Sequence, residues 1–143
     1  MKFGEALANQ LRYTRILLLD GPLGAGKTSL VKGIGKGLGI NEPITSPTFA
    51  LAHHYLTGTR ALLHLDLYRL EDETAANALF IEEEEISNQL NGLIVIEWPS
   101  RLNLVIDDAC RMRISYLSNE GREVELISSS KDSKNVCTSE ELG

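Results

Sequence analysis

The chain has 143 residues and a formal net charge of −6, from 14 lysines and arginines against 20 aspartates and glutamates. This length favours one domain, and 43% hydrophobic with 24% charged residues excludes collagen-like, mostly disordered and disulfide-dense chains. The apolar runs fall far short of the roughly 20 residues that span a bilayer, and no secretory leader is visible, so we expect a cytoplasmic protein. The acidic balance also disfavours a protein whose main task is to hold nucleic acid.

The first part of the chain predicts a helix, a strand and a second helix. Apolar residues recur four apart over residues 3–11, which is typical of an amphipathic helix. The apolar run Ile16–Leu19 predicts a strand buried on both faces, and a glycine-rich turn separates it from a helix over residues 27–38. Three glycines each weaken this second helix by about 1 kcal/mol relative to alanine. We therefore expect it to depend on packing, with its thin face close to the sheet.

The middle of the chain predicts a hairpin and a long helix. Residues 49–56 and 61–68 have the character of strands, and the short link between them contains glycine, which favours an antiparallel hairpin. Residues 72–90 predict a helix that is interrupted near Glu82–Glu85. We expect these four glutamates to form a solvated helix face without chemistry.

The last part predicts a buried strand at Leu93–Ile96 and a second hairpin from residues 111–117 and 122–127. Together these elements predict an α/β layer fold with a mixed sheet that includes antiparallel hairpins. We expect one ATPase domain over residues 1–127. The polar residues 128–143 predict a disordered tail.

The eight residues GPLGAGKT, which begin at Gly21, satisfy the phosphate-loop pattern G-x-x-x-x-G-K-[ST] in full and lie between a predicted strand and helix. Gly21, Gly24 and Gly26 let the backbone point successive N–H groups into one nest at the positive end of the helix. Lys27 adds a full charge, with an attraction of about 4 kcal/mol at 4 Å and an effective dielectric of 20, before desolvation. Thr28 offers a hydroxyl to Mg²⁺. We therefore predict a nucleoside-triphosphate site.

Two acids at the ends of predicted strands are candidates for the metal and for the attacking water. Asp66 follows one apolar strand and Glu97 follows another. Because the carboxyl ends of strands face the ligand crevice in open α/β sheets, either acid could reach Mg²⁺ directly or through water. The residues alone leave open which acid contacts the metal and which orients the water.

Four segments, in this order, resemble the TsaE family (also called YjeE) of small ATPases that assist bacterial synthesis of threonylcarbamoyladenosine (t6A) at position 37 of tRNA. They are Gly21–Thr28, Ser46–Phe49, His64–Arg69 and Glu97–Pro99. The phosphate loop occurs in many families, but its combination with the other three segments is much more specific. The resemblance covers about residues 4–127 and implies a P-loop NTPase-like, three-layer fold.

The resemblance also implies roles for single residues. Mg²⁺ would lie on Thr28 with Glu97, and Asp66 would be a second acid, needed for hydrolysis and a further metal candidate. Ser46–Phe49 resembles a switch-like segment that senses the γ-phosphate, and Trp98 resembles a tryptophan beside the active centre. The implied catalytic residues are Lys27, Asp66 and Glu97, and the implied ATP-binding residues are Gly21, Gly24, Ala25, Gly26, Lys27, Thr28, Ser29 and Arg122.

Three functions follow from these features. The first is a weak, Mg²⁺-dependent ATPase that supports t6A formation with TsaD and TsaB, the partners implied by the resemblance, which would hold the tRNA. The second is a small-molecule kinase, which would need a basic lid, for which Arg60, Arg69 and Arg101 are available. The third is an ATP-dependent binding switch without useful turnover.

Overall fold

The computed structural model describes residues 2–22, 24–47, 51–117, 121–128 and 139–142. Its helices and strands follow one another along the chain as α1 (Lys2–Gln10), β1 (Ile16–Asp20), α2 (Lys27–Gly37), β2 (Ala52–Tyr55), β3 (Leu62–Asp66), α3 (Glu73–Gln89), β4 (Leu93–Glu97), the 3-10 helix η1 (Pro99–Arg101), β5 (Cys110–Tyr116), β6 (Arg122–Ser128) and β7 (Ser139–Leu142). Among these elements, none is a helix long and apolar enough to cross a membrane.

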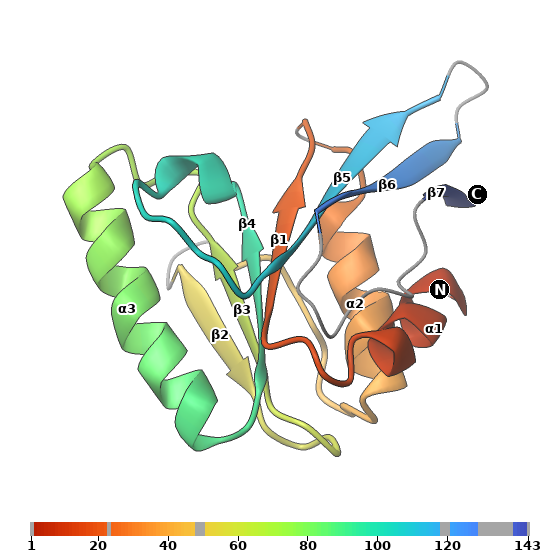
Figure 1. The fold of residues 1–143 in the computed structure, drawn as a ribbon. Coiled ribbons are helices and arrows are strands. Elements are labelled where there is room, and N and C mark those ends of the chain that lie inside the picture. Colours follow the sequence, from red (N-terminus) through yellow and green to blue (C-terminus); the bar gives the residue numbers. More distant parts are fainter. Residues whose placement is uncertain (1, 23, 48–50, 118–120, 129–138, 143) are drawn as a thin grey trace.

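The strands form one mixed sheet in the order β2-β3-β4-β1-β5-β6-β7. Strands β3, β4, β1 and β5 run parallel to one another, whereas β2–β3, β5–β6 and β6–β7 are antiparallel pairs. The predicted mixed sheet with antiparallel hairpins is therefore confirmed. Glu97 is level with Leu19 on one side and Asp66 on the other, so the carboxyl ends of β1, β3 and β4 meet at one edge (Figure 1).

The sheet lies between two helical layers, α1 with α2 on one side and α3 on the other (Figure 1). Alternate residues of β1 serve the two sides: Leu17 and Leu19 belong to the core that contains α1 and α2, and Ile16 and Leu18 to the core that contains Phe80 of α3. This alternation explains why β1 is apolar at every position before its last, as predicted for a strand buried on both faces. The predicted three-layer, P-loop NTPase-like fold is confirmed.

The long helix differs from its prediction, because α3 continues without interruption through the four glutamates. Glu83 is also not on a solvated face: it is 7% exposed, and its Oε2 lies 2.5 Å from Nε2 of His54 on the edge strand β2. A helix packed beside an edge strand can place one acid of a charged run against a strand partner while the others face solvent. Charge alone could not reveal which glutamate that would be.

The thin face of α2 contacts α1 and a loop residue rather than the sheet. A Cβ atom at Gly4 of α1 would lie 2.7 Å from the Cα of Gly33, and one at Gly37 would lie 2.7 Å from the Cβ of Ala8. A Cβ at Gly35 would overlap Cδ1 of Ile44. The expected close approach of the α2 glycines to the sheet is therefore wrong, because the larger residues of α2 face the sheet and its glycines face α1 and Ile44.

The expected tail begins at residue 128, which is the last residue of β6. Residues 139–142 form β7, which pairs antiparallel with β6. Residues 129–138 between these strands lie outside the described part of the chain.

Candidate functional site

The phosphate loop joins the carboxyl end of β1 to the first turn of α2. Gly24 and Gly26 have φ angles of 76° and 100°, which favour glycine because residues with a Cβ atom rarely adopt them. Gly26 caps α2 without a side-chain hydrogen bond, and a Cβ there would meet nothing within 4 Å. The first amides of α2 have no acceptor within the helix, as at any helix N-terminus, which makes them available to an anion.

This loop forms one wall of a pocket of about 320 Å³ at the carboxyl edge of the sheet. The size lies in the range of ordinary small-molecule sites. The lining comes from the phosphate loop and from the ends of β3 and β4: Gly24, Gly26, Lys27, Thr28, Ser29, Ser46, Asp66, Glu97 and Trp98. The fold therefore brings together most of the predicted site.

Lys27 lines the pocket and is only 5% exposed. Its Nζ donates hydrogen bonds to the carbonyl oxygens of Gly21 (2.5 Å) and Pro22 (2.9 Å) and lies 4.8 Å from the centre of the Trp98 ring. Burial lowers the pKa of the ammonium below its ordinary value, while Glu97, and after it Asp66 and Asp20, oppose that shift. The ammonium therefore lies inside the loop, next to the space that phosphates would occupy.

Thr28 faces Glu97 across the pocket, and a buried histidine supports Glu97 from behind. The Thr28 hydroxyl lies 3.4 Å from Oε2 of Glu97, and Nε2 of His64 lies 2.6 Å from the same oxygen. His64 is 0% exposed and Glu97 is 3% exposed. In the parallel pair β3–β4, Asp66 is level with Glu97, and His64 stands two residues before Asp66 on the same face of β3.

Asp66 lies beside Glu97 at the end of β3 and accepts two hydrogen bonds. The backbone N–H of Tyr68 donates to Oδ1 (3.1 Å), and the Ser46 hydroxyl donates to Oδ2 (3.3 Å). Burial raises the pKa of Asp66, with Glu97 adding to the shift, while the hydrogen bonds and His64 oppose it. A pocket carboxyl with a raised pKa is suited to accept a proton or to orient water. Ser46 belongs to the switch-like segment, of which Thr48 and Phe49 lie outside the described residues.

Trp98 closes one side of the pocket in an uncommon backbone conformation. Its φ of 60° and ψ of 51° are left-handed, a region that costs a non-glycine residue free energy. The indole packs on the Tyr68 ring with centroids 4.8 Å apart, and Arg101 donates a hydrogen bond to the Tyr68 carbonyl (2.9 Å). These contacts hold the indole close to the ammonium of Lys27.

Three predicted nucleotide-binding residues do not line the pocket. Gly21 faces β5, where a Cβ would lie 2.6 Å from the carbonyl oxygen of Ile114, and Ala25 is buried in the core. Arg122 stacks on the ring of Tyr116, with 4.1 Å from its guanidinium carbon to the ring centroid. The contact of Arg122 with bound nucleotide thus stays a prediction.

Residue-level reasoning missed two contributors to the site. No role is predicted for His64 from the sequence, although the H-x-D spacing in a strand puts its side chain on the same face as that of Asp66. No sequence pattern marks Tyr116 as part of the site. Its hydroxyl lies 2.7 Å from where a Cβ of Gly24 would be, because β5 runs beside β1.

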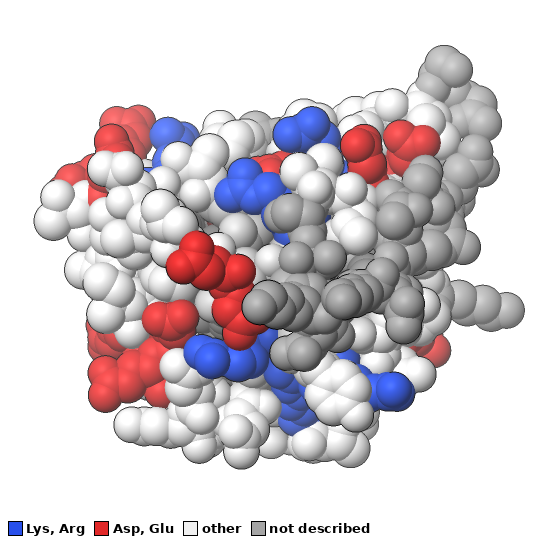
Figure 2. Space-filling model, viewed as in Figure 1, with Lys and Arg blue, Asp and Glu red and all other residues white. Residues whose placement is uncertain are grey.

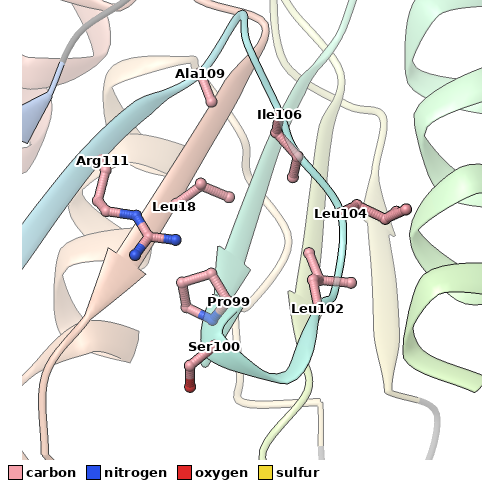
Figure 3. A pocket seen from close by; sticks show the side chains of 8 residues that line it. All are labelled: Leu18, Pro99, Ser100, Leu102, Leu104, Ile106, Ala109 and Arg111. Atoms are coloured by element: carbon pink, nitrogen blue, oxygen red, sulfur yellow. The ribbon is translucent and has the colours of Figure 1, made fainter. Parts of the chain in front are cut away.

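A second hollow, of about 340 Å³, lies on the side of the sheet that α3 covers only in part. Figure 3 shows Leu18 and Arg111 on neighbouring strands, with Leu102 and Ile106 on the segment that follows η1. Arg111 pairs with Asp20 at 3.3 Å. Apart from Arg111 and Ser100 the lining side chains are apolar, so this hollow lacks the carboxylates and the lysine of the phosphate-loop pocket.

The arginines considered for a kinase lid do not come together at the pocket. Arg60 lies at the opposite edge of the sheet, in a hollow of about 480 Å³ that also contains Arg12 and Arg15. Figure 2 shows Lys and Arg side chains near the lower end of the molecule, where the chain enters β1, and acidic side chains over α3. Arg101 is bound to Tyr68 instead.

The side chains present fit a magnesium ion. Thr28, Glu97 and Asp66 offer hydroxyl and carboxylate oxygens, which are the ligands that Mg²⁺ prefers. Phosphates usually bind Mg²⁺ together with such side chains, and Lys27 and the first amides of α2 suit those phosphates. The described residues contain no cluster of three or more His, Cys, Asp or Glu that could hold a metal alone. A metal here would therefore take some of its ligands from a bound phosphate and from the Thr28 hydroxyl.

Comparison with known proteins agrees with this geometry. The profile of a family described as threonylcarbamoyl adenosine biosynthesis protein TsaE matches residues 1–124. A crystal structure of YdiB from Bacillus subtilis superposes with a TM-score of 0.61 and 26% identity, covering 85% of this chain and 75% of that one.

Three curated relatives are named tRNA threonylcarbamoyladenosine biosynthesis protein TsaE. The relative from Nostoc sp. is 39% identical and covers 88% of this chain, which spans 78% of that relative. The relative from Synechocystis sp. is 46% identical, and the match covers 71% of this chain and 64% of the relative. The relative from Aquifex aeolicus is 34% identical, and the match covers 87% of this chain and 86% of the relative. The chain belongs to the TsaE family.

Proposed function

We propose that this protein binds ATP with Mg²⁺ and hydrolyses it slowly in support of t6A formation on tRNA. The observation that carries the proposal is the phosphate-loop pocket, where Lys27, Thr28 and Glu97 converge beside the first amides of α2. Both charge and hydrogen-bond donors in this pocket suit a triphosphate.

The residues of the chain would act mainly by position and charge. Lys27 leaves its two carbonyl partners for the outer phosphates, since a phosphate carries far more negative charge than a carbonyl. Thr28 and Glu97 would hold Mg²⁺, because their side chains already face one another. When bound, Mg²⁺ neutralises charge on the terminal phosphates.

Asp66 is the residue we assign to the attacking water. It lines the pocket beside Glu97, and its raised pKa suits proton acceptance better than metal binding. Ser46 holds one of its oxygens, so movement of the switch-like segment would change how Asp66 is oriented. Positioning of this kind accounts for most of the catalysis in P-loop ATPases.

The biological role is inferred from family membership. The relatives are named for t6A biosynthesis, and the family resemblance implies TsaD and TsaB as partners. The net charge of −6 agrees with tRNA being held by those partners rather than by this chain.

ATP turnover measured with and without TsaD, TsaB and tRNA tests the proposal. We expect slow release of phosphate by the chain alone, strong stimulation by the complex, and none with Lys27→Ala. Binding of ATP without turnover in any mixture would instead indicate a binding switch. A phosphorylated metabolite in place of free phosphate would indicate a kinase.

A further inference from the structure

His64 is the most deeply buried polar side chain near the site, and it makes one described hydrogen bond. Its Nε2 lies 2.6 Å from Oε2 of Glu97, and its Nδ1 is buried without a hydrogen-bond partner among the described residues. An ionised carboxylate only accepts hydrogen bonds, so Nε2 carries the hydrogen and donates it to Glu97. A buried imidazole with an unpaired nitrogen costs stability, which calls for a reason why it stands here.

The reason lies in the charges around Glu97. Glu97 is 3% exposed, and among the acids near Lys27 it acts most strongly on the ammonium. Without another donor, a buried carboxylate gains most by turning toward the ammonium. Such an ion pair would engage the two groups that phosphate and metal need.

We propose that His64 is a positioning residue that holds the Glu97 carboxylate toward Thr28 and away from Lys27. This inference rests on the proposed nucleotide site. The hydrogen bond from Nε2 fixes Oε2, which is the same oxygen that the Thr28 hydroxyl faces at 3.4 Å. Hydrogen bonds to the ligands of a metal ion orient those ligands, and their loss typically costs 10- to 100-fold in metal affinity.

The side-chain amides of glutamine and asparagine separate this role from simple packing. The Nε2 of glutamine occupies nearly the place of the histidine Nε2, whereas the shorter asparagine places its donor near Nδ1. We therefore expect His64→Gln to keep the function, and His64→Asn and His64→Leu to lose it.

The readout is the factor by which Mg²⁺ strengthens binding of a non-hydrolysable ATP analogue, from calorimetry with Mg²⁺ and with chelator. We expect this factor to fall at least tenfold in His64→Leu and His64→Asn and to change less than threefold in His64→Gln. Binding without Mg²⁺ should stay within threefold in every variant. Trp98, the one tryptophan of the chain, provides a second readout through its fluorescence.

His53→Leu is the matched control, because His53 is level with His64 on the neighbouring strand but bonds Tyr55 instead. It should leave the Mg²⁺ factor unchanged. Equal losses with and without Mg²⁺ would mean that His64 only supports the fold and would overturn the inference, as would full function in His64→Leu. If the wild-type chain binds no nucleotide, the proposed function itself fails. If it binds nucleotide and His64→Asn matches His64→Gln, only the role of His64 fails.

Discussion

Asp66 lies in the pocket with a pKa that burial raises above its ordinary value of 3.8. The folded protein therefore keeps a proton on Asp66 at pH values where the unfolded chain has lost it. Stability from this group is fully present below pH 3.8 and is lost as the pH rises through the raised value. The charged carboxyl is thus held in the pocket at a cost to stability, which is common at functional sites.

We expect Asp66→Asn to melt at a higher temperature than the wild type at pH 7, because the amide carries no charge to desolvate. Ser46 can accept from the new amide, so its hydrogen bond need not be lost. Thermal melts from pH 7 to pH 3.5 should show the difference shrinking as the wild-type carboxyl takes up its proton. An advantage that is constant with pH would argue against the raised pKa, and the variant should lose ATP turnover.

The roles of some site residues can be predicted from a sequence pattern, whereas the roles of others depend on how the strands pair. Lys27, Thr28 and Glu97 follow from a loop pattern and a strand end, and the structure places them together as expected. The support of Glu97 by His64 depends on the register of β3 and β4, which spacing in one strand does not reveal. Sequence patterns thus predict groups near the ligand better than the groups behind them.

Arg60 connects separate elements at the edge of the sheet opposite the phosphate loop. Its guanidinium donates hydrogen bonds to the carbonyls of Leu11 and Thr14, after α1, and of Asn91 and Gly92, after α3. A cation at helix C-terminal ends is stabilising, because the last carbonyls there carry partial negative charge. Arg60 therefore has a structural role in this arrangement.

We expect Arg60→Met to lower the free energy of unfolding by about 2–4 kcal/mol, since hydrogen bonds from charged donors contribute about 1.5–3 kcal/mol each and are not additive. Urea unfolding followed by circular dichroism measures this. Arg69→Met, at an exposed position, should change stability by less than about 0.5 kcal/mol. A loss no larger in Arg60→Met than in Arg69→Met would contradict the structural role, and nucleotide affinity of the folded variant should be unchanged.

Elements were predicted best where one residue pattern decides them. Short apolar runs predict the strands β1 and β4, and short links that contain glycine predict both hairpins. The continuity of α3 and the contact of the α2 glycines with α1 depend on partners distant in the sequence. Tertiary packing decides such features, and local propensity cannot.

At the scale of the whole molecule, the sheet separates two edges with different tasks. The carboxyl edge carries the phosphate loop, both acids and Trp98, and the opposite edge carries Arg60 and the helix ends. The order of strands places β1 between β4 and β5, so Glu97 and Tyr116 reach the loop from its two sides. Only this topology, and no single motif, assembles the complete pocket.

Calorimetric titration of Mg²⁺ and ATP into the chain, alone and with TsaD and TsaB, tests the central claim most directly. The account predicts uptake of one nucleotide per chain. It also predicts at least hundredfold weaker uptake by a folded Lys27→Ala variant, because the ammonium contributes about 4 kcal/mol of attraction before desolvation. No uptake by the wild-type chain in either setting, or equal uptake by Lys27→Ala with an unchanged melting temperature, would contradict it.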